Sequence, residues 1–301
     1  MAKQHLRIGV GAGFAGDRWE PAVELVEHGD IDVIAFECLA ERTIARETLA
    51  LHRGEGPGYS PKLEERLRAV LPACAEKGIR VVTNMGAAAP EAAARAACAI
   101  AAELDLGDFS CVVLLGDDVR EVLSKRPELI LLETGAPLES ILPRMASANA
   151  YLGADAVAEA LVNDALVVMT GRVADPSLFV GPMLHAFGWS YDDYAILAQA
   201  TAAGHLLECA GQVTGGYFAD PGVKDVPGLA RLGFPFADVS ADGDIVIGKI
   251  AEAGGRVDVK TCSEQLLYEV DDPAAYITPD CVLDMGGISL TEVARDRVEV
   301  A

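Results

Sequence analysis

The sequence contains no C-x-x-C pair, no internal repeat, and no apolar run approaching the roughly 20 residues that cross a bilayer. Its cysteines are odd in number and mostly lie within apolar runs such as FSCVVLL. They are Cys38, Cys74, Cys98, Cys111, Cys209, Cys262 and Cys281. This usage predicts buried, reduced thiols in a reducing compartment, and we expect a cytoplasmic protein with no membrane partner.

Positive charge is also scarce. The chain has 24 Lys and Arg against 46 Asp and Glu, which gives a formal net charge of −22. Nucleic acids and anionic membranes are bound through a basic surface, so this balance excludes both classes of partner. With 301 residues, 51% of them hydrophobic, the chain has enough apolar side chains for a large core in one or two domains.

The first two thirds of the chain alternate apolar runs with helical patterns. We predict strands at 6–10, 32–37, 79–84, 110–118, 127–133 and 165–172. Because these runs are apolar on both faces and alternate with helices, they indicate a parallel sheet that is covered on both sides. The predicted fold is therefore α/β, a doubly wound and mostly parallel sheet.

The pattern changes near residue 220. The segments FADVS, DIVIGKI and RVDVK read as short alternating strands separated by Asp-Gly and Gly-Gly turns, which predicts antiparallel hairpins. We therefore expect an α/β domain over 1–220 that holds a ligand cleft, and a smaller α+β region over 221–301. The final segment DRVEVA reads as a strand that needs a neighbour.

Polar residues follow most of the predicted parallel strands. Ligands of open parallel sheets collect at the carboxyl ends of the strands, so these positions are the first candidates for a binding cleft. The candidates at these strand ends are Gly11, Gly13, Gly16, Asp17, Glu37, Asn84, Asp117, Arg172 and Asp175, and we add Thr214 and Gly215 from a later glycine loop. The competing interpretation is that strand ends are polar because they meet water.

Gly11, Gly13 and Gly16 have the G-x-G-x-x-G spacing, and Glu37 ends the next predicted strand where a ribose-binding acid stands in dinucleotide folds. Asp17, however, places a negative charge beside the turn and opposes a pyrophosphate. A tight turn whose amides hold some other anion is the simpler interpretation.

The segment YAILAQATAAGHLLECAG reads as a helix that ends at Gly211 and brings His205, Glu208 and Cys209 within one turn. A histidine with a carboxylate three residues on suits a general base with its orienting partner, and the thiol is a candidate nucleophile. Two ligand-type residues without a second cluster do not make a metal site, so we predict none. The structural alternative is a helix end with a buried cysteine and a hydrogen-bonded histidine.

Several segments in order along nearly the whole chain resemble one family. They are GAGFAGDR, FECLAERTIA, TNMGAAAP, GDDV, ANAYLGADAV, TGRVADPSLFVGPMLHAFGW, GHLLECAGQVTGG and EQLLYEVDDPAAYITPDCVLD. Together they resemble the acyclic terpene utilisation (AtuA) family. The resemblance implies a bacterial cytosolic protein that acts near branched acyl-CoA intermediates. Members usually continue past DRVEVA, so we expect its neighbour to come from a second subunit or a further segment.

Three hypotheses follow. The first is a lyase or hydratase acting on a branched acyl-CoA or related carboxylate, with His205 as general base, Glu208 as its partner, Arg172 as a clamp and Asn84 as a donor to developing charge. The second is a scaffold or regulatory subunit of a partner enzyme. The third is a dinucleotide-dependent oxidoreductase. None of them fixes a cofactor, and we expect a homo-oligomer or a complex with a second subunit.

Overall fold

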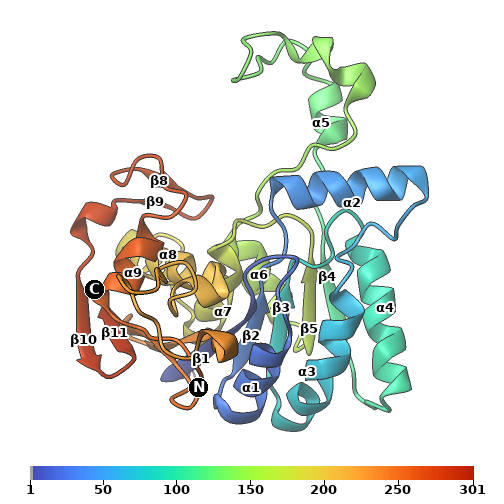
Figure 1. The fold of residues 1–301 in the computed structure, drawn as a ribbon. Coiled ribbons are helices and arrows are strands. Elements are labelled where there is room, and N and C mark those ends of the chain that lie inside the picture. Colours follow the sequence, from blue (N-terminus) through green and yellow to red (C-terminus); the bar gives the residue numbers. More distant parts are fainter. Residues whose placement is uncertain (1–2) are drawn as a thin grey trace.

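The computed structural model describes residues 3–301, which form a mixed sheet of nine strands in the order β10-β11-β7-β6-β1-β2-β3-β5-β4 (Figure 1). The parallel half consists of β1 (His5–Ala12), β2 (Val33–Phe36), β3 (Arg80–Thr83), β5 (Val167–Thr170) and β4 (Cys111–Leu114). The antiparallel half consists of β6 (Pro235–Ser240), β7 (Ile245–Lys249), β11 (Arg297–Val300) and β10 (Leu290–Ala294). The predicted α/β class, with a mostly parallel sheet and antiparallel C-terminal strands, is confirmed.

Helices cover both faces of the sheet, as the double winding requires. On one face α1 packs on α3 and α3 on α4. These helices are α1 (Glu20–His28), α3 (Leu63–Lys77) and α4 (Pro90–Glu103). On the other face each helix packs on the next: α6 (Ala154–Leu161), α7 (Ser177–Phe187), α8 (Tyr194–Glu208) and α9 (Val259–Leu266). Strands β2 and β5 are buried along their whole length between these layers, because VIAF and VVMT have no polar face.

The remaining elements lie outside the two helical layers. A separate two-stranded sheet is formed by β8 (Tyr276–Ile277) and β9 (Val282–Leu283). Short 3₁₀ turns are η3 (Ala210–Gln212), η4 (Leu229–Arg231) and η5 (Met285–Gly287). Helix α2 (Glu41–Arg53) crosses above the carboxyl edge of the parallel strands (Figure 1). Within residues 3–301, no helix combines the length and the apolar character needed to cross a membrane.

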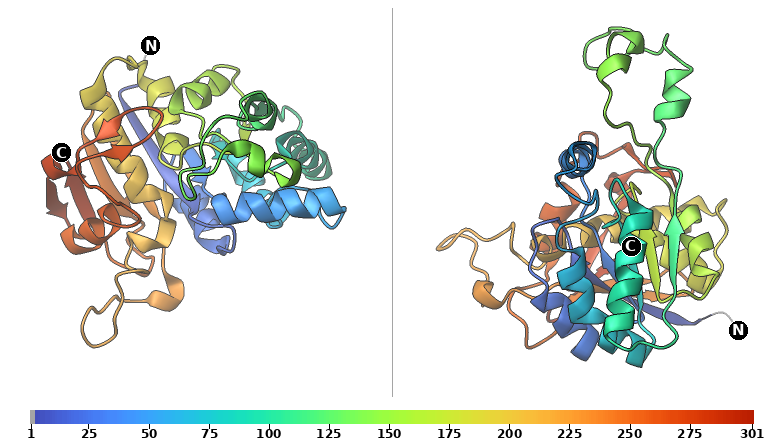
Figure 2. Two further views of the ribbon diagram at one scale, coloured as in Figure 1. Left: turned by 90° about the horizontal axis from the view of Figure 1, so that it is seen from above. Right: turned by 90° about the vertical axis from the view of Figure 1, so that its right-hand side faces the viewer.

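Residues 119–148 form an arm that leaves the carboxyl edge after β4. It holds α5 (Arg120–Ser124), η1 (Leu138–Ser140) and η2 (Leu142–Arg144), and it projects away from the body in Figures 1 and 2. A bridge between Asp118 and Asn149 closes its base. The predicted strand at 127–133 lies in this arm and is wrong: Ile130 makes only an isolated bridge to Pro137, and the segment never reaches the sheet.

Two C-terminal expectations are also corrected. RVDVK is not a strand, because Asp258 caps α9 by accepting hydrogen bonds from the backbone amides of Lys260 and Thr261. The strand in DRVEVA is β11, which lies between β7 and β10, so the chain itself supplies both neighbours. Because β6 pairs with β1, the C-terminal strands continue the parallel sheet, and the division into domains at residue 220 stays a prediction.

Candidate functional site

A cavity of about 620 Å³ opens at the carboxyl edge of the sheet, between the loops after β1 and β2 and the end of α8. Five acidic residues line it: Asp17, Glu37, Asp175, Glu208 and Glu269. Most of its large apolar side chains come from distant parts of the chain: Phe14, Leu39, Tyr217, Leu232, Phe234 and Tyr268. The cavity therefore combines an apolar wall with a group of carboxyl groups, and we call it the central cavity.

Glu37 is held at the end of β2 by two donors. Its Oε1 accepts hydrogen bonds from Asn84 Nδ2 and from the backbone amide of Leu39, both at 2.8 Å. Burial raises the pKa of Glu37 to about 7; the two hydrogen bonds and Arg172 oppose that rise, and the charge of Glu208 adds to it. Both donors act on Oε1, which leaves Oε2 as the oxygen that is available to carry or deliver a proton.

Asn84 follows β3 and joins two strand ends. Its Oδ1 accepts a hydrogen bond from the backbone amide of Cys38 at 2.7 Å, while its Nδ2 donates to Glu37. The side chain is fully buried and both ends of its amide are used within the protein. Asn84 therefore fixes Glu37 and the turn after β2, and it contacts the central cavity through Glu37.

His205 and Glu208 form a buried pair on α8, at the i, i+3 spacing that the sequence predicts. His205 Nδ1 lies 2.8 Å from Glu208 Oε1. Burial opposes a charged imidazole, but the charge of Glu208 and its hydrogen bond raise the pKa of His205 overall. Glu208 lines the central cavity and His205 does not, so the histidine stands behind the carboxylate. Glu208 Oε2 and His205 Nε2 are buried without a hydrogen-bond partner among residues 3–301.

Cys209, the next residue, also lines the central cavity. Burial raises the pKa of its thiol, and the charge of Glu208 raises it further. The nucleophile of cysteine chemistry is the thiolate, which this environment disfavours. The structure therefore argues against Cys209 as a nucleophile.

Arg172, which follows β5, is already engaged by the protein. Its guanidinium donates to Asp175 Oδ1 and to Glu41 Oε1, each at 3.0 Å, and to the carbonyl of Leu39. It also lies over the ring of Tyr151, 4.3 Å from the centroid. Burial raises the pKa of Asp175, and the charges of Glu37 and Glu208 raise it further. Arg172 thus compensates buried acids, and its use as a substrate clamp stays a prediction that requires some of these bonds to open.

The glycine loop after β1 holds a carboxylate of the protein itself. Asp17 Oδ2 accepts hydrogen bonds from the backbone amides of Gly13 at 2.7 Å and Phe14 at 3.2 Å. A side chain on Gly13 would come within 2.3 Å of the backbone of Cys209, so glycine is needed for the loop to reach the end of α8. Gly11 lies inside β1, and α1 begins well after Gly16. This geometry differs from a dinucleotide turn, in which the amides face a pyrophosphate.

Arg66 anchors this loop and was not recognised in the sequence. The residue is fully buried, and its Nη2 donates to the carbonyls of Phe14, Ala15 and Asp17 at distances of 3.2, 3.3 and 2.8 Å. Its Nη1 lies 3.0 Å from Cys38 Sγ. An arginine in the first turn of a helix gives no local signal of this contact, because only the fold brings the loop to it.

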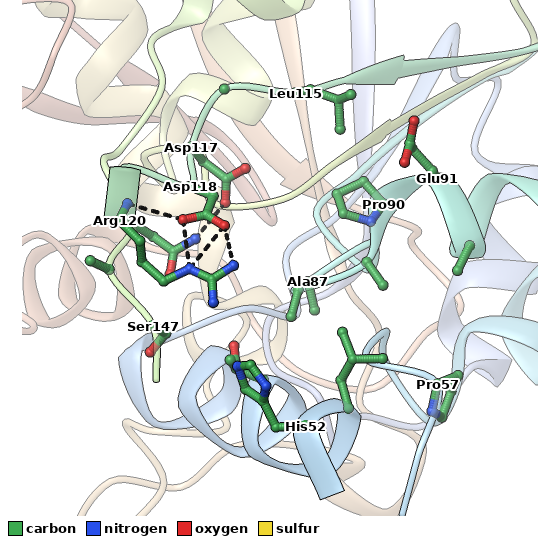
Figure 3. Close-up of a pocket in the computed structure, with 18 of the residues that line it drawn as sticks. His52, Pro57, Ala87, Pro90, Glu91, Leu115, Asp117, Asp118, Arg120 and Ser147 are labelled. Atoms are coloured by element: carbon green, nitrogen blue, oxygen red, sulfur yellow. Dashed lines mark hydrogen bonds and ion pairs between the residues drawn. The ribbon is translucent and has the colours of Figure 1, made fainter. Parts of the chain in front are cut away.

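The remaining predicted residues lie elsewhere. Asp117 lines a second cavity of about 470 Å³ between α2, the start of α4 and the base of the arm (Figure 3). Its Oδ2 accepts from the backbone amide of Arg172 and from Asn149 Nδ2, both at 2.8 Å. Thr214 is buried and donates to the carbonyl of Gly233 at 2.7 Å, and neither Thr214 nor Gly215 lines the central cavity. Of the strand-end candidates, Gly13, Asp17, Glu37 and Asp175 line the central cavity and Asp117 lines the second, whereas Gly11, Gly16, Asn84 and Arg172 line neither.

The chain matches the model of the acyclic terpene utilisation family protein AtuA over residues 6–301. The protein belongs to the AtuA family. Neither a curated protein nor a solved structure matches it. Within residues 3–301 of this AtuA protein, no three His, Cys, Asp or Glu side chains are grouped so that they could hold a metal ion. Membership indicates a role in acyclic terpene utilisation.

Proposed function

We propose that this AtuA protein is an enzyme of acyclic terpene or branched-acid degradation, and that it adds or removes water, or cleaves a related bond as a lyase, on a branched acyl thioester or carboxylate. One observation carries the proposal. A carboxyl group with a pKa near 7, Glu37, and a histidine-supported carboxylate, Glu208, line the same cavity. Two titratable groups in unlike environments supply an acid and a base together.

Glu37 is the proposed acid. In a dehydration, the leaving hydroxyl needs a proton, which it takes from Glu37 Oε2 so that it departs as water. A pKa of about 7 leaves a large fraction of Glu37 protonated at neutral pH, which suits proton transfer in either direction. Asn84 positions this acid because it holds Oε1.

Glu208 is the proposed base, and His205 is its positioning partner. The carboxylate removes the proton next to the carbonyl carbon, and the released electron pair forms the double bond as the hydroxyl leaves. His205 holds Oε1, so the unpartnered Oε2 is the oxygen left for the substrate. The proposal thus exchanges the two roles of the sequence-based hypothesis, in which His205 is the general base and Glu208 its partner.

The walls of the cavity support a branched apolar substrate. Phe234, Leu232 and Tyr268 supply hydrocarbon and aromatic surface beside the acids. Arg42 lines the same cavity from α2, is exposed, and makes no ion pair or side-chain hydrogen bond among residues 3–301. A free guanidinium at this position suits the phosphates of a coenzyme A ester.

Turnover of branched enoyl-CoA and 3-hydroxyacyl-CoA esters tests the proposal. We expect Glu37→Gln and Glu208→Gln each to lower kcat by at least about 100-fold, the usual effect of losing a general acid or base. Glu269→Gln is the matched control, because Glu269 lines the same cavity but is exposed. Full turnover by His205→Ala would contradict the role of the histidine in the mechanism. Equal activity of all four variants would contradict the assignment of the active site to the central cavity.

The two alternatives make different predictions. A scaffold subunit leaves every ester unchanged when purified alone, and it gains function only with its partner. A dinucleotide-dependent oxidoreductase is stabilised by NAD, NADP or a flavin, since a ligand that prefers the folded state raises Tm. The bonds from Asp17 to the glycine-loop amides count against the second alternative.

A further inference from the structure

The arm formed by residues 119–148 has almost no core of its own. It contains eleven large aliphatic or methionine side chains, yet Leu138 is its only buried residue. Leu132 is 97% exposed, Val122 60% and Ile130 59%. Ordering one residue costs about 1–2 kcal/mol of conformational entropy, which burial has to offset. An arm of thirty residues with one buried side chain does not offset that cost alone, so its apolar surface needs a partner.

The body of this chain does not serve as that partner. The arm projects away from the sheet and its helices in Figure 1 and in the right-hand view of Figure 2. Its contacts with the body lie at the base, where the carbonyl of Ala146 is 3.3 Å from His52 Nε2 and the Asp118–Asn149 bridge closes the two legs. Its own folding consists of short helical turns and local backbone hydrogen bonds, such as that from the amide of Leu138 to the carbonyl of Leu129 at 2.7 Å. The tip therefore remains open to a second molecule.

The charges of the arm identify the kind of partner. Residues 119–148 carry four Lys and Arg and four Asp and Glu, so the arm is neutral on a chain whose net charge is −22. The positive residues are Arg120, Lys125, Arg126 and Arg144, and the negative ones are Glu121, Glu128, Glu133 and Glu139. In a two-fold contact the same patch meets itself, so a patch with a net charge would repel its copy, and a neutral mixed patch does not. A basic foreign partner would instead be drawn to the acidic body.

The size of the arm fits the same conclusion. A stable protein interface uses about 20–30 residues on each side. The arm supplies thirty residues that follow one another in sequence, with the apolar run LILL at its tip. This run reads as a buried strand in the sequence, and burial against an equal partner accounts for its hydrophobicity. We propose that two copies of this chain associate arm against arm, through the apolar side chains around Ile130 and Leu132.

Sedimentation velocity of the purified full chain at 1, 10 and 50 µM tests the proposal. We expect a mass twice that of the 31.5 kDa chain. In Leu132→Asp the dissociation constant of the dimer should rise by about 30-fold or more, which is the loss of one strong apolar contact. Val223→Asp is the matched control, because Val223 is 78% exposed on a loop outside the arm and its replacement should leave the mass unchanged.

Hydrogen exchange gives a second measurement that does not depend on a variant. Amides of residues 129–138 should exchange more slowly at 50 µM than at 1 µM, because association covers the arm. A wild-type chain that remains monomeric at 50 µM overturns the proposal, and the partner of the arm would then be a different protein. The proposal is also overturned if the dimer is equally intact in Leu132→Asp and Val223→Asp and hydrogen exchange in the arm does not depend on concentration. The contact between the two copies would then lie outside the arm.

Discussion

Burial raises the pKa of the Glu37 carboxyl group to about 7, and its replacement by glutamine removes the titration while it keeps the shape of the side chain. Glutamine keeps an oxygen that accepts from Asn84 Nδ2 and from the amide of Leu39, as Glu37 Oε1 does. Its NH₂ group takes the position of the protonated Oε2. Glu37→Gln therefore mimics the protonated state at every pH. The stabilities of wild type and variant should differ most at pH values at which Glu37 is ionised.

The direction in which the free energy of unfolding changes with pH follows from the linkage between proton binding and folding. A folded-state pKa of about 7 against an ordinary value of 4.5 means that the folded chain binds a proton more tightly than the unfolded chain. The stability that this proton contributes is complete below about pH 4.5 and is lost as the pH rises through 7. Each pKa unit corresponds to about 1.36 kcal/mol, so wild type should lose on the order of 2–3 kcal/mol relative to Glu37→Gln between pH 5 and pH 8.

Urea unfolding at the two pH values measures this loss. The comparison is the difference between variant and wild type, in which the other titrating groups largely cancel. In thermal unfolding the same change amounts to roughly 4 °C in Tm for a chain of this length. Glu252→Gln, at an exposed position, is the control and should show no such pH dependence. A difference that stays constant within about 0.5 kcal/mol from pH 5 to pH 8 would refute the reasoning, because it would place Glu37 in contact with water.

Two further predictions concern the walls of the cavity. Arg66→Leu should lower the free energy of unfolding, measured in urea, by on the order of 3 kcal/mol, because three loop carbonyls lose their buried donor. Arg68→Gln, at an exposed position on the same helix, is the control and should cost at most about 1 kcal/mol. Equal losses in the two variants would contradict the anchoring role of Arg66. Cys209 should react with a thiol reagent at pH 8 much more slowly than exposed Cys98, because burial raises the pKa of the Cys209 thiol, and mass spectrometry of partly labelled protein would contradict this if Cys209 were modified first.

The sequence predicts the parallel half of this sheet because each of its strands can be recognised from its own local sequence. VIAF and VVMT are short, rich in valine and isoleucine or methionine, and alternate with helical segments, a pattern typical of strands that are covered on both faces. The polar residues after them were predicted to meet, and Glu37 and Asn84 do so, since adjacent parallel strands end at the same edge. The right-handed connections between parallel strands therefore leave few alternative positions for these residues.

Other parts depend on contacts that no local pattern encodes. Helical spacing predicts that His205 and Glu208 lie side by side, but which of them faces the cavity depends on how α8 packs against the sheet. The run LILL is apolar enough for a strand, and hydrophobicity alone does not distinguish burial in the core from exposure on an arm. RVDVK alternates like a strand, yet Asp258 and Thr261 form a helix cap there, so local side-chain bonding overrides the period.

The charges around the central cavity contribute to the retention of this proton. Three buried or half-buried carboxyl groups, Glu37, Asp175 and Glu208, face two bases, Arg172 and a His205 whose pKa is raised. Even with His205 charged, the three carboxylates outnumber the two cations, one of which also pairs with the exposed Glu41, and an excess of buried negative charge is costly. Glu37 and Asp175 both have raised pKa values, so they compete for that proton. A carboxyl group that retains a proton at this site is what the proposed acid–base chemistry requires.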